Sequence, residues 1–352
     1  MAHGFLLVAI AALFLPYQYA IAGVNDIADA VDAGDVEALA KALAVDGQSP
    51  ADPSVIIDSL KRVNKPDHYG FTPLHTAASH GCVPCVALLL DSGGAAIDAK
   101  TGKETGAQHE GETALMIAAA GPRGSGAHVA TARALLERGA DRTATSRAGY
   151  TALHGAASQG HVEIVKMLLE APSGGGAEAA GHGVGGGQRR QLSAAALDAL
   201  LSARTAVLDL QSKRGRATRV GSRATPLHVA AMAPGNDAVV KVLLAAGADA
   251  SSLDRHGNSP AHLAFLVGNV EAARAMLEAD ATLALFENKN GQTPLDLAHE
   301  GFHKKPLGRK GMDEAARDAL EALHAEALPA ATAARDKAMG GAGGTAAQKA
   351  EL

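Results

Sequence analysis

Thr225-Pro226-Leu227-His228 is one of six related tetrads in this 352-residue chain, and the spacing between these tetrads decides the fold. The last three tetrads begin at regular intervals of 34 residues, whereas insertions lengthen the earlier intervals. The six tetrads begin at Thr72, Thr113, Thr151, Thr225, Ser259 and Thr293. A motif that recurs in this way indicates a stack of similar units, each of which buries its apolar face against its neighbours.

Each tetrad has the chemistry of a helix start. The Thr or Ser hydroxyl is placed to accept a hydrogen bond from a backbone N–H that the first helical turn leaves free. Proline at the next position lacks an N–H that would be unpaired there anyway, and the leucine begins an apolar stripe. We expect the histidine to bridge to the backbone of a neighbouring unit. Alanine pairs follow, such as Ala77-Ala78 and Ala230-Ala231, and their small side chains let adjacent helices approach closely.

A second amphipathic helix follows these starts. In the clearest example, residues 160–169, Val162 and Leu168 share one helical face. Gly-Ala-Asp turns at 139–141 and 247–249 close two of the second helices, because glycine lets the chain leave a helix with a positive φ. Each unit is therefore predicted to be a pair of helices joined by a short turn.

These tetrads, alanine pairs and helix pairs resemble the ankyrin repeat, a β-turn followed by two antiparallel helices in about 33 residues. The resemblance implies an all-α solenoid of stacked helix–turn–helix units, with β-turn or hairpin fingers and one long Gly- and Arg-rich insertion. We count seven units, of which the first is a divergent cap. The chain departs from the family pattern at Met116 and Asp296, which replace the histidine, and at Arg223, where a turn glycine is usual.

The pattern divides the chain into segments. They are a signal peptide at 1–22, a divergent capping repeat at 23–65, ankyrin repeats at 66–172, a Gly-rich linker with a basic insertion at 173–222, further ankyrin repeats at 223–304, a capping helix at 305–328 and a disordered tail at 329–352. Pro329 is expected to end the capping helix, because proline cannot continue the helical hydrogen bonding. The Ala- and Gly-rich composition beyond Pro329 predicts disorder.

Both ends of the chain carry features of targeting signals. Residues 5–15 are almost unbroken apolar sequence, and residues 20–22 are Ala-Ile-Ala, which suits cleavage before Gly23. Residues 349–352 resemble the KDEL-type retrieval signal, with Ala350 in place of an acidic residue. Together these features predict the secretory pathway, with residence in the endoplasmic reticulum lumen. A cytoplasmic location is the alternative, because most proteins of the resembled family work in the cytosol or nucleus. No later stretch approaches the roughly 20 apolar residues that a membrane span needs.

The insertion is strongly basic, although the formal net charge of the whole chain is -5. Residues 189–223 contain eight basic and two acidic residues, and a short helix is expected at 192–201. One interpretation is a basic finger for an acidic partner, a lipid headgroup or RNA, and the other is a solvated loop. No aromatic residue interleaves the arginines for base stacking, which favours the solvated loop and argues against nucleic acid as a partner.

Two features could carry chemistry, and neither predicts an enzyme. Cys82 and Cys85 form a Cys-x-x-Cys motif, which favours reactive thiols at helix amino termini, but no thioredoxin-like βαβ pattern accompanies it. Cys85 matches Ile164, a core-facing position, so a structural cysteine is favoured over a redox one. The tetrad histidines belong to separate units about 10 Å apart, too far to share a metal ion. We predict no catalytic residue, no metal and no cofactor, and a monomeric chain.

The resemblance to ankyrin repeats also implies where a partner binds, namely the turn tips and the exposed side of the first helices. Carried over position by position, the predicted partner-binding residues are His68, Tyr69, Phe71, Ser79, His80, Arg147, Tyr150, Ser158, Gln159, Arg255, His256, Asn258, Leu266, Val267, Lys289, Asn290 and Gln292. Tyr69, Phe71 and Tyr150 come first, because aromatic side chains are frequent hot spots. The alternative for each is packing against a neighbouring turn.

The predicted function is a non-catalytic scaffold or adaptor for an unidentified protein partner. A lumenal thiol-redox protein that uses Cys82 and Cys85 is one alternative, and a cytosolic ankyrin adaptor is the other.

Overall fold

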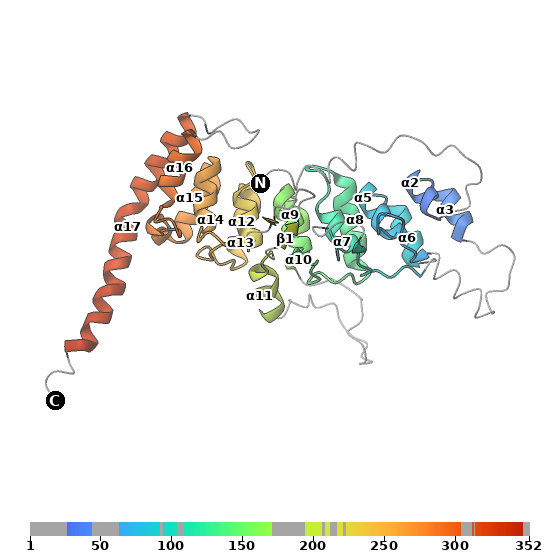
Figure 1. The fold of residues 1–352 in the computed structure, drawn as a ribbon, viewed down its shortest axis with the longest axis horizontal. Helices are drawn as coiled ribbons and strands as arrows, with labels where there is room; N and C mark the ends of the chain where they lie inside the picture. Colours follow the sequence, from blue (N-terminus) through green and yellow to red (C-terminus); the bar gives the residue numbers. More distant parts are fainter. Residues whose placement is uncertain are drawn as a thin grey trace. The chain divides into compact units, whose positions relative to one another are not determined.

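The structure is a computed structural model, and it describes residues 27–43, 63–91, 94–103, 109–170, 194–205, 208–211, 217–220, 223–303, 312 and 314–347. The chain divides into two compact units, Met1–Gly221 and Ser222–Leu352, and each is described by itself (Figure 1). The predicted signal peptide, residues 173–193 of the predicted linker and insertion, and the retrieval signal lie outside the described residues. Within the described residues, no helix combines the length and the apolar character that crossing a membrane requires.

The described part of the first unit contains paired helices in chain order. The pairs are α2 (Ile27–Asp32) with α3 (Val36–Leu43), α5 (Pro73–His80) with α6 (Val83–Asp91), α7 (Ala114–Ala119) with α8 (Gly126–Glu137), and α9 (Ala152–Gln159) with α10 (Val162–Leu169). From α5 to α10, each first helix packs against the next first helix, and each second helix against the next second helix (Figure 1). The tetrads at Thr72, Thr113 and Thr151 open equivalent helices, as the repeat pattern predicts.

The second unit repeats this arrangement. Its elements are α12 (Pro226–Ala231) with α13 (Asp237–Ala245), α14 (Pro260–Val267) with α15 (Val270–Ala279), the 3-10 helix η2 (Ala281–Leu285), α16 (Pro294–His303) and the long helix α17 (Glu314–Ala347). Helix α17 packs against η2, α15 and α16 and so covers the end of this stack (Figure 1). The capping role predicted for the carboxy-terminal helix agrees with this position.

Small apolar side chains form the core of both units. Ala77, Ala78, Ala156, Ala157, Ala230 and Ala231 each have 0% of their surface exposed. Because these small side chains lie on the first helices, the first helices of adjacent repeats approach closely and leave few voids. Phe265 is the largest of the fully buried side chains, and leucines such as Leu74 and Leu227 fill most of the remaining core.

The insertion has local structure of its own. Helix α11 (Ala194–Ser202) forms where a short helix is expected. An antiparallel hairpin follows, made of β1 (Leu208–Gln211) and β2 (Ala217–Val220), in which Leu208 pairs with Val220. Composition alone does not indicate this hairpin, but the sequence of β1 alternates apolar and polar residues with the period of a strand.

Helix α17 corrects the prediction for the carboxyl terminus. The capping helix is predicted to end at Pro329, yet it continues through this proline to Ala347. A proline inside a helix removes one N–H donor and crowds the preceding turn, at a cost of about 3 kcal/mol. Alanine, the strongest helix former, surrounds Pro329 on both sides, and Ala331 is fully buried. The prediction of disorder is therefore wrong for residues 329–347, while residues 348–352 lie outside the described part of the chain.

Candidate protein-binding surface

Three tetrad histidines, His75, His228 and His262, connect their helix starts to the next repeat. In the first unit, Nδ1 of His75 accepts hydrogen bonds from the backbone N–H and the hydroxyl of Thr72, at 3.1 and 2.9 Å. The proton therefore sits on Nε2, which donates to the carbonyl oxygens of Ala99 at 2.9 Å and Glu112 at 3.1 Å. These bonds confirm the predicted bridge from the histidine to the backbone of a neighbouring unit.

The second unit uses the same bridge. Nε2 of His228 donates to the carbonyl of Asn258, and Nε2 of His262 donates to the carbonyl of Gln292, each at 3.1 Å.

The last tetrad departs from this pattern at Asp296, whose Oδ2 accepts from the backbone N–H and the hydroxyl of Thr293 at 2.8 and 2.7 Å. A carboxylate keeps the helix cap, but it has no proton to donate to a carbonyl. Asp296 therefore preserves one half of the histidine's role and loses the other.

Burial favours the neutral form of two bridging histidines, His75 and His262. Removal from water is the main cause that lowers the pKa of His75 to about 4, although the hydrogen bonds to Ala99 and Glu112 oppose it. Burial also lowers the pKa of His262. A neutral imidazole has one acceptor and one donor nitrogen, which is what the cap and the bridge require. These histidines are therefore structural groups in this fold.

A second polar residue shapes the turn in front of a tetrad. Five residues before the Thr or Ser, an Asp, Asn or Ser side chain folds back onto the turn; these residues are Asp67, Ser146, Asp254 and Asn288. Oδ1 of Asp254, for example, accepts from the backbone N–H groups of His256 at 2.7 Å and Asn258 at 2.8 Å. Comparison of the tetrads alone overlooks these residues, although their constant offset is visible in the sequence.

Backbone hydrogen bonds join neighbouring turns, which we term fingers. The described residues of the fingers are 67–71, 101–103 with 109–112, 146–150, 254–258 and 288–292. In the first unit the N–H of Gly102 donates to the carbonyl of Gly70 at 2.9 Å, and in the second unit the N–H of Lys289 donates to the carbonyl of His256 at 3.0 Å. Such contact needs glycine at Gly257, where a Cβ atom would lie 2.9 Å from the nitrogen of Lys289. The finger tips in each unit are therefore held in place by their neighbours.

Comparison with known proteins decides the family. The profile described as ankyrin repeats in three copies matches residues 96–178 and 223–305, and the single ankyrin repeat profile matches residues 69–102. These matches together span more than half of the chain. The chain belongs to the ankyrin-repeat family.

Several known proteins are similar to parts of this one. Ankyrin repeat and SOCS box protein 16 of Mus musculus is 42% identical over 115 residues, which are 32% of this chain and 24% of that protein. Neurogenic locus notch homolog protein 1 of Xenopus tropicalis is 31% identical over 261 residues, 73% of this chain and 9% of that protein. The human ASB11 ankyrin repeat domain has a crystal structure that aligns with a TM-score of 0.52 and 22% identity, covering 86% of this chain and 98% of that domain.

The chain spans about a quarter or less of the length of these two curated relatives. The solved structure shares the fold with this chain.

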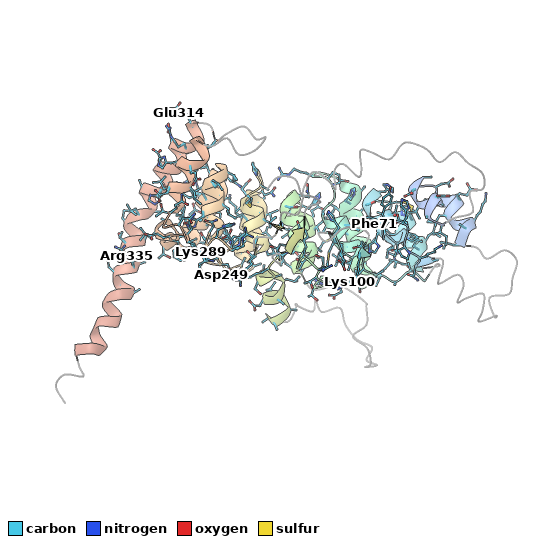
Figure 2. The ribbon with its side chains drawn as sticks, in the orientation of Figure 1. Phe71, Lys100, Asp249, Lys289, Glu314 and Arg335 are labelled. Carbon is cyan, nitrogen blue, oxygen red and sulfur yellow. A yellow bond between two sulfur atoms is a disulfide. The ribbon has the colours of Figure 1, made fainter. Side chains whose placement is uncertain are left out.

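The predicted partner-binding residues lie on the fingers and first helices of the ankyrin repeats. His68, Tyr69, Ser79, His80, Arg147, His256, Lys289 and Asn290 are exposed, whereas Phe71, Tyr150, Ser158, Gln159, Arg255, Asn258, Leu266, Val267 and Gln292 are partly buried. Phe71 lies on the first unit and Lys289 on the second (Figure 2). The residues numbered up to 159 belong to the first unit and those from 255 onward to the second.

Tyr69 stands out among the three aromatic residues that the sequence places first. It has 55% of its surface exposed, and its ring lies beside that of His68 with 3.7 Å between centroids. The backbone N–H of Tyr69 donates to Oδ1 of Asp67 at 2.9 Å, so the tip is fixed while the ring faces solvent. A large ring held out in this way suits contact with a partner.

Phe71 and Tyr150 instead pack within their own repeats. The ring of Phe71 meets the ring of His75 edge-on with 6.3 Å between centroids, and the ring of Tyr150 lies 5.1 Å from that of His154. Burial raises the pKa of Tyr150 to about 12, with a smaller opposing effect from the hydrogen bond to Ser158. These contacts favour the packing alternative for both residues, and their part in binding stays a prediction.

The finger tips of the second unit have a basic character. Arg255, His256 and Lys289 lie on adjacent fingers, and Nζ of Lys289 donates to the carbonyl of Arg255 at 2.8 Å. The neighbouring carboxylate of Asp254 is buried and accepts from backbone N–H groups. Within these two fingers the positive side chains are therefore Lys289, which is exposed, and Arg255, which is partly buried.

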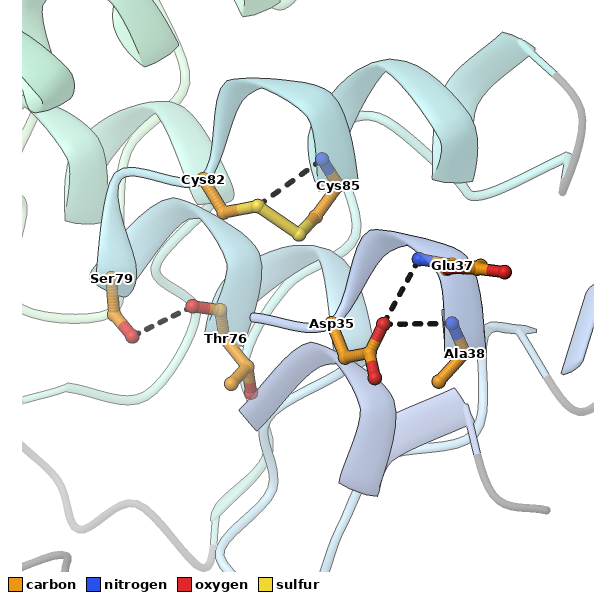
Figure 3. Close-up of a disulfide and its surroundings, with 7 residues drawn as sticks. All are labelled: Asp35, Glu37, Ala38, Thr76, Ser79, Cys82 and Cys85. Carbon is orange, nitrogen blue, oxygen red and sulfur yellow. Dashed lines mark hydrogen bonds between the residues drawn. A yellow bond between two sulfur atoms is a disulfide. The ribbon is translucent and has the colours of Figure 1, made fainter. Parts of the chain in front are cut away.

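The cysteine motif forms a disulfide between Cys82 and Cys85 (Figure 3). Cys85 has 0% of its surface exposed, like Ile164, which confirms the core-facing position expected for it. Among the described residues, no three His, Cys, Asp or Glu side chains are placed to hold a metal ion together.

Proposed function

We propose that this chain is a non-catalytic scaffold that binds a partner protein through its finger tips and the exposed sides of its first helices. The main support for this proposal is the set of hydrogen bonds that hold the fingers in place. Asp67, Asp254 and Asn288 hold their own turns, and backbone bonds join adjacent fingers. A surface that is already ordered loses little conformational entropy when a partner binds.

The two units offer different chemistry to a partner. The first unit presents the exposed ring of Tyr69 beside His68, which suits a partner with an apolar or aromatic side chain at the contact. The second unit presents Arg255, His256 and Lys289, which suit an acidic segment. We expect the aromatic tip to dominate affinity and the basic tips to dominate the rate of association and its dependence on salt.

Quantitative affinity capture with the full chain tests this proposal. Wild-type protein and the double variant His68→Ala/Tyr69→Ala are immobilised, and bound proteins from lumenal and cytosolic fractions are identified and quantified by mass spectrometry. The matched control is Lys166→Ala, which removes an exposed side chain from the second helix α10. Recovery of a specific partner should fall at least about tenfold with the finger variant and stay unchanged with the control. Equal recovery with both variants, or a loss confined to Lys166→Ala, would reject the finger surface.

We further propose that the protein enters the secretory pathway. The apolar segment at 5–15 and the small residues at 20–22 support this location, and a disulfide is typical of oxidising compartments. Amino-terminal sequencing of the mature protein is the test. A start at Gly23 supports entry into the pathway, whereas a start at Met1 or Ala2 favours the cytosolic adaptor.

A further inference from the structure

We infer that Cys82 and Cys85 form a thiol–disulfide exchange site, at which Cys82 is the sulfur that reacts with low-molecular-weight thiols and disulfides of the glutathione class. This inference is independent of the proposed partner surface. It starts from the position of the pair: Cys82 immediately precedes helix α6, and Cys85 lies in the first turn of that helix.

The same position has a structural role in other repeats, which Cys82 lacks. His161 precedes α10, and its Nε2 donates to the carbonyl of Gly121 in the preceding repeat at 2.9 Å. Asn269 precedes α15, and its Nδ2 donates to the carbonyl of Ala231 in the preceding repeat at 3.4 Å. Cys82 is instead bonded to Cys85 in the first turn of the helix that it precedes. The residue that elsewhere links two repeats is thus replaced here by a disulfide.

This disulfide adds little to the fold. It joins residues only three apart in sequence, and a short closed loop restricts the unfolded chain least. Val86 and Leu89 of the same helix are fully buried and hold α6 against its neighbours without any sulfur. Breaking the bond therefore leaves the packing of the repeat intact.

The two cysteine residues differ in accessibility. Cys85 has 0% of its surface exposed, whereas Cys82 is partly exposed. A nucleophile from solvent therefore reaches Cys82 first, and Cys85 becomes the leaving group and later the resolving thiol.

The helix start stabilises negative charge on Cys82. The backbone N–H of Cys85 donates to Sγ of Cys82 at 3.3 Å, as the dashed line in Figure 3 shows. Cys82 also lies at the positive end of the α6 dipole, which favours a thiolate over a thiol. The nearby carboxylate of Asp35 is directed to its own helix, where it accepts from the N–H groups of Glu37 and Ala38 (Figure 3).

The exchange is balanced in two steps. A thiolate RS⁻ attacks Sγ of Cys82, the Cys82–Cys85 bond breaks, and the electron pair goes to the sulfur of Cys85, which takes up a proton. A second thiolate attacks the external sulfur of the Cys82–SR bond, which releases RSSR and leaves Cys82 as the thiolate. Two external thiols are oxidised to one disulfide while the protein disulfide is reduced to two thiols, and the reverse reaction reduces an external disulfide.

Thiol trapping on the full-length protein tests this inference. Wild type is incubated without denaturant in buffers of increasing ratio of reduced to oxidised glutathione, quenched with acid, alkylated, and examined by peptide mass spectrometry. We expect reversible reduction of the pair, with hydrogen exchange in α6 unchanged. Reduction only after urea has unfolded the chain, or loss of protection in α6 on reduction, would overturn the inference.

Matched variants identify the reacting sulfur. Cys85→Ala removes the resolving thiol and should accumulate a mixed disulfide of glutathione on Cys82. Cys82→Ala leaves the buried thiol of Cys85 and should react at least about tenfold more slowly. Equal labelling of the two variants would contradict the assignment of Cys82. If Cys85→Ala does not fold, the reduction of the wild-type disulfide without denaturant tests the inference on its own.

Discussion

Replacement of His262 by alanine should loosen one finger without melting the repeat array. The ring of His262 is fully buried, and its Nδ1 accepts from the backbone N–H of Ser259 at 3.1 Å and from the hydroxyl at 2.8 Å. Its Nε2 donates to the carbonyl of Gln292 at 3.1 Å, a carbonyl that also accepts from the N–H of Asn288. Three hydrogen bonds at about 1 kcal/mol each, together with the cavity left by the ring, predict a loss of about 3–4 kcal/mol.

Hydrogen exchange followed by mass spectrometry measures this loss locally, which matters because unfolding of a repeat array need not be a single transition. Protection of the finger at 288–292 should fall about fivefold in His262→Ala, because of the three bonds only that from Nε2 to Gln292, worth about 1 kcal/mol, holds this finger, while the other two bonds hold the start of α14. His256→Ala is the matched control, because His256 is exposed at the tip of the adjacent finger. A change below about threefold in His262→Ala, or an equal change in the control, would refute the role assigned to the bridging histidines.

His262→Asp separates the two halves of this role. Asp296 shows that a carboxylate at the same tetrad position accepts from the backbone N–H and hydroxyl of its Thr. The variant should therefore keep the start of α14 protected while the finger at 288–292 remains loosened. Equal loss at both places would mean that the cap and the bridge are not independent.

Four further predictions follow from single positions. The pKa of His75 is about 4 in the folded chain and about 6.5 when unfolded, so the unfolded state binds more protons between these two pH values. Urea titrations followed by circular dichroism should therefore show that this histidine lowers the free energy of unfolding by about 3 kcal/mol between pH 6.5 and pH 4. Above pH 6.5 it should contribute no further change. Gly257→Ala should destabilise more than Gly291→Ala in the same titrations, since both glycines have positive φ but only the first would bring a Cβ atom against a backbone nitrogen; equal losses would contradict the close contact. Arg223 has a φ of 56°, so Arg223→Gly should raise the melting temperature through relief of about 1 kcal/mol of strain. Pro329→Ala should increase helical circular dichroism and stabilise α17 by about 1–3 kcal/mol, and unchanged helicity would mean that the proline costs nothing there.

The repeat fold could be predicted because its signals are local. A Thr or Ser cap, a Pro at the first helical position and a spacing of 34 residues each reflect the chemistry of one helix start. The bridge from His75 was predictable for the same reason, since a buried imidazole needs partners for both nitrogens. Arg223 was recognised as occupying a glycine position, and its backbone has the left-handed conformation that this position requires.

The parts that were missed depend on contacts that no single motif contains. The predicted end of α17 at Pro329 is wrong because it rests on the helix-breaking effect of proline alone. The helix-forming alanines around Pro329 and the burial of Ala331 act in the opposite direction. The β1–β2 hairpin lies in a segment whose basic composition hides its short alternating pattern. For the candidate site, residue type and place in the repeat predict partner binding equally for Tyr69 and Tyr150. Only the packing around each ring distinguishes the exposed Tyr69 from Tyr150, whose ring packs inside its own repeat.

The most direct test of the central claim is the footprint of a captured partner on the full chain. Hydrogen exchange of the protein, measured with and without the partner, should show new protection at the fingers and along the first helices α5, α9 and α14. Protection confined to the second helices α8, α10, α13 and α15 would contradict the proposed binding surface, because the partner would then contact neither the fingers nor the first helices.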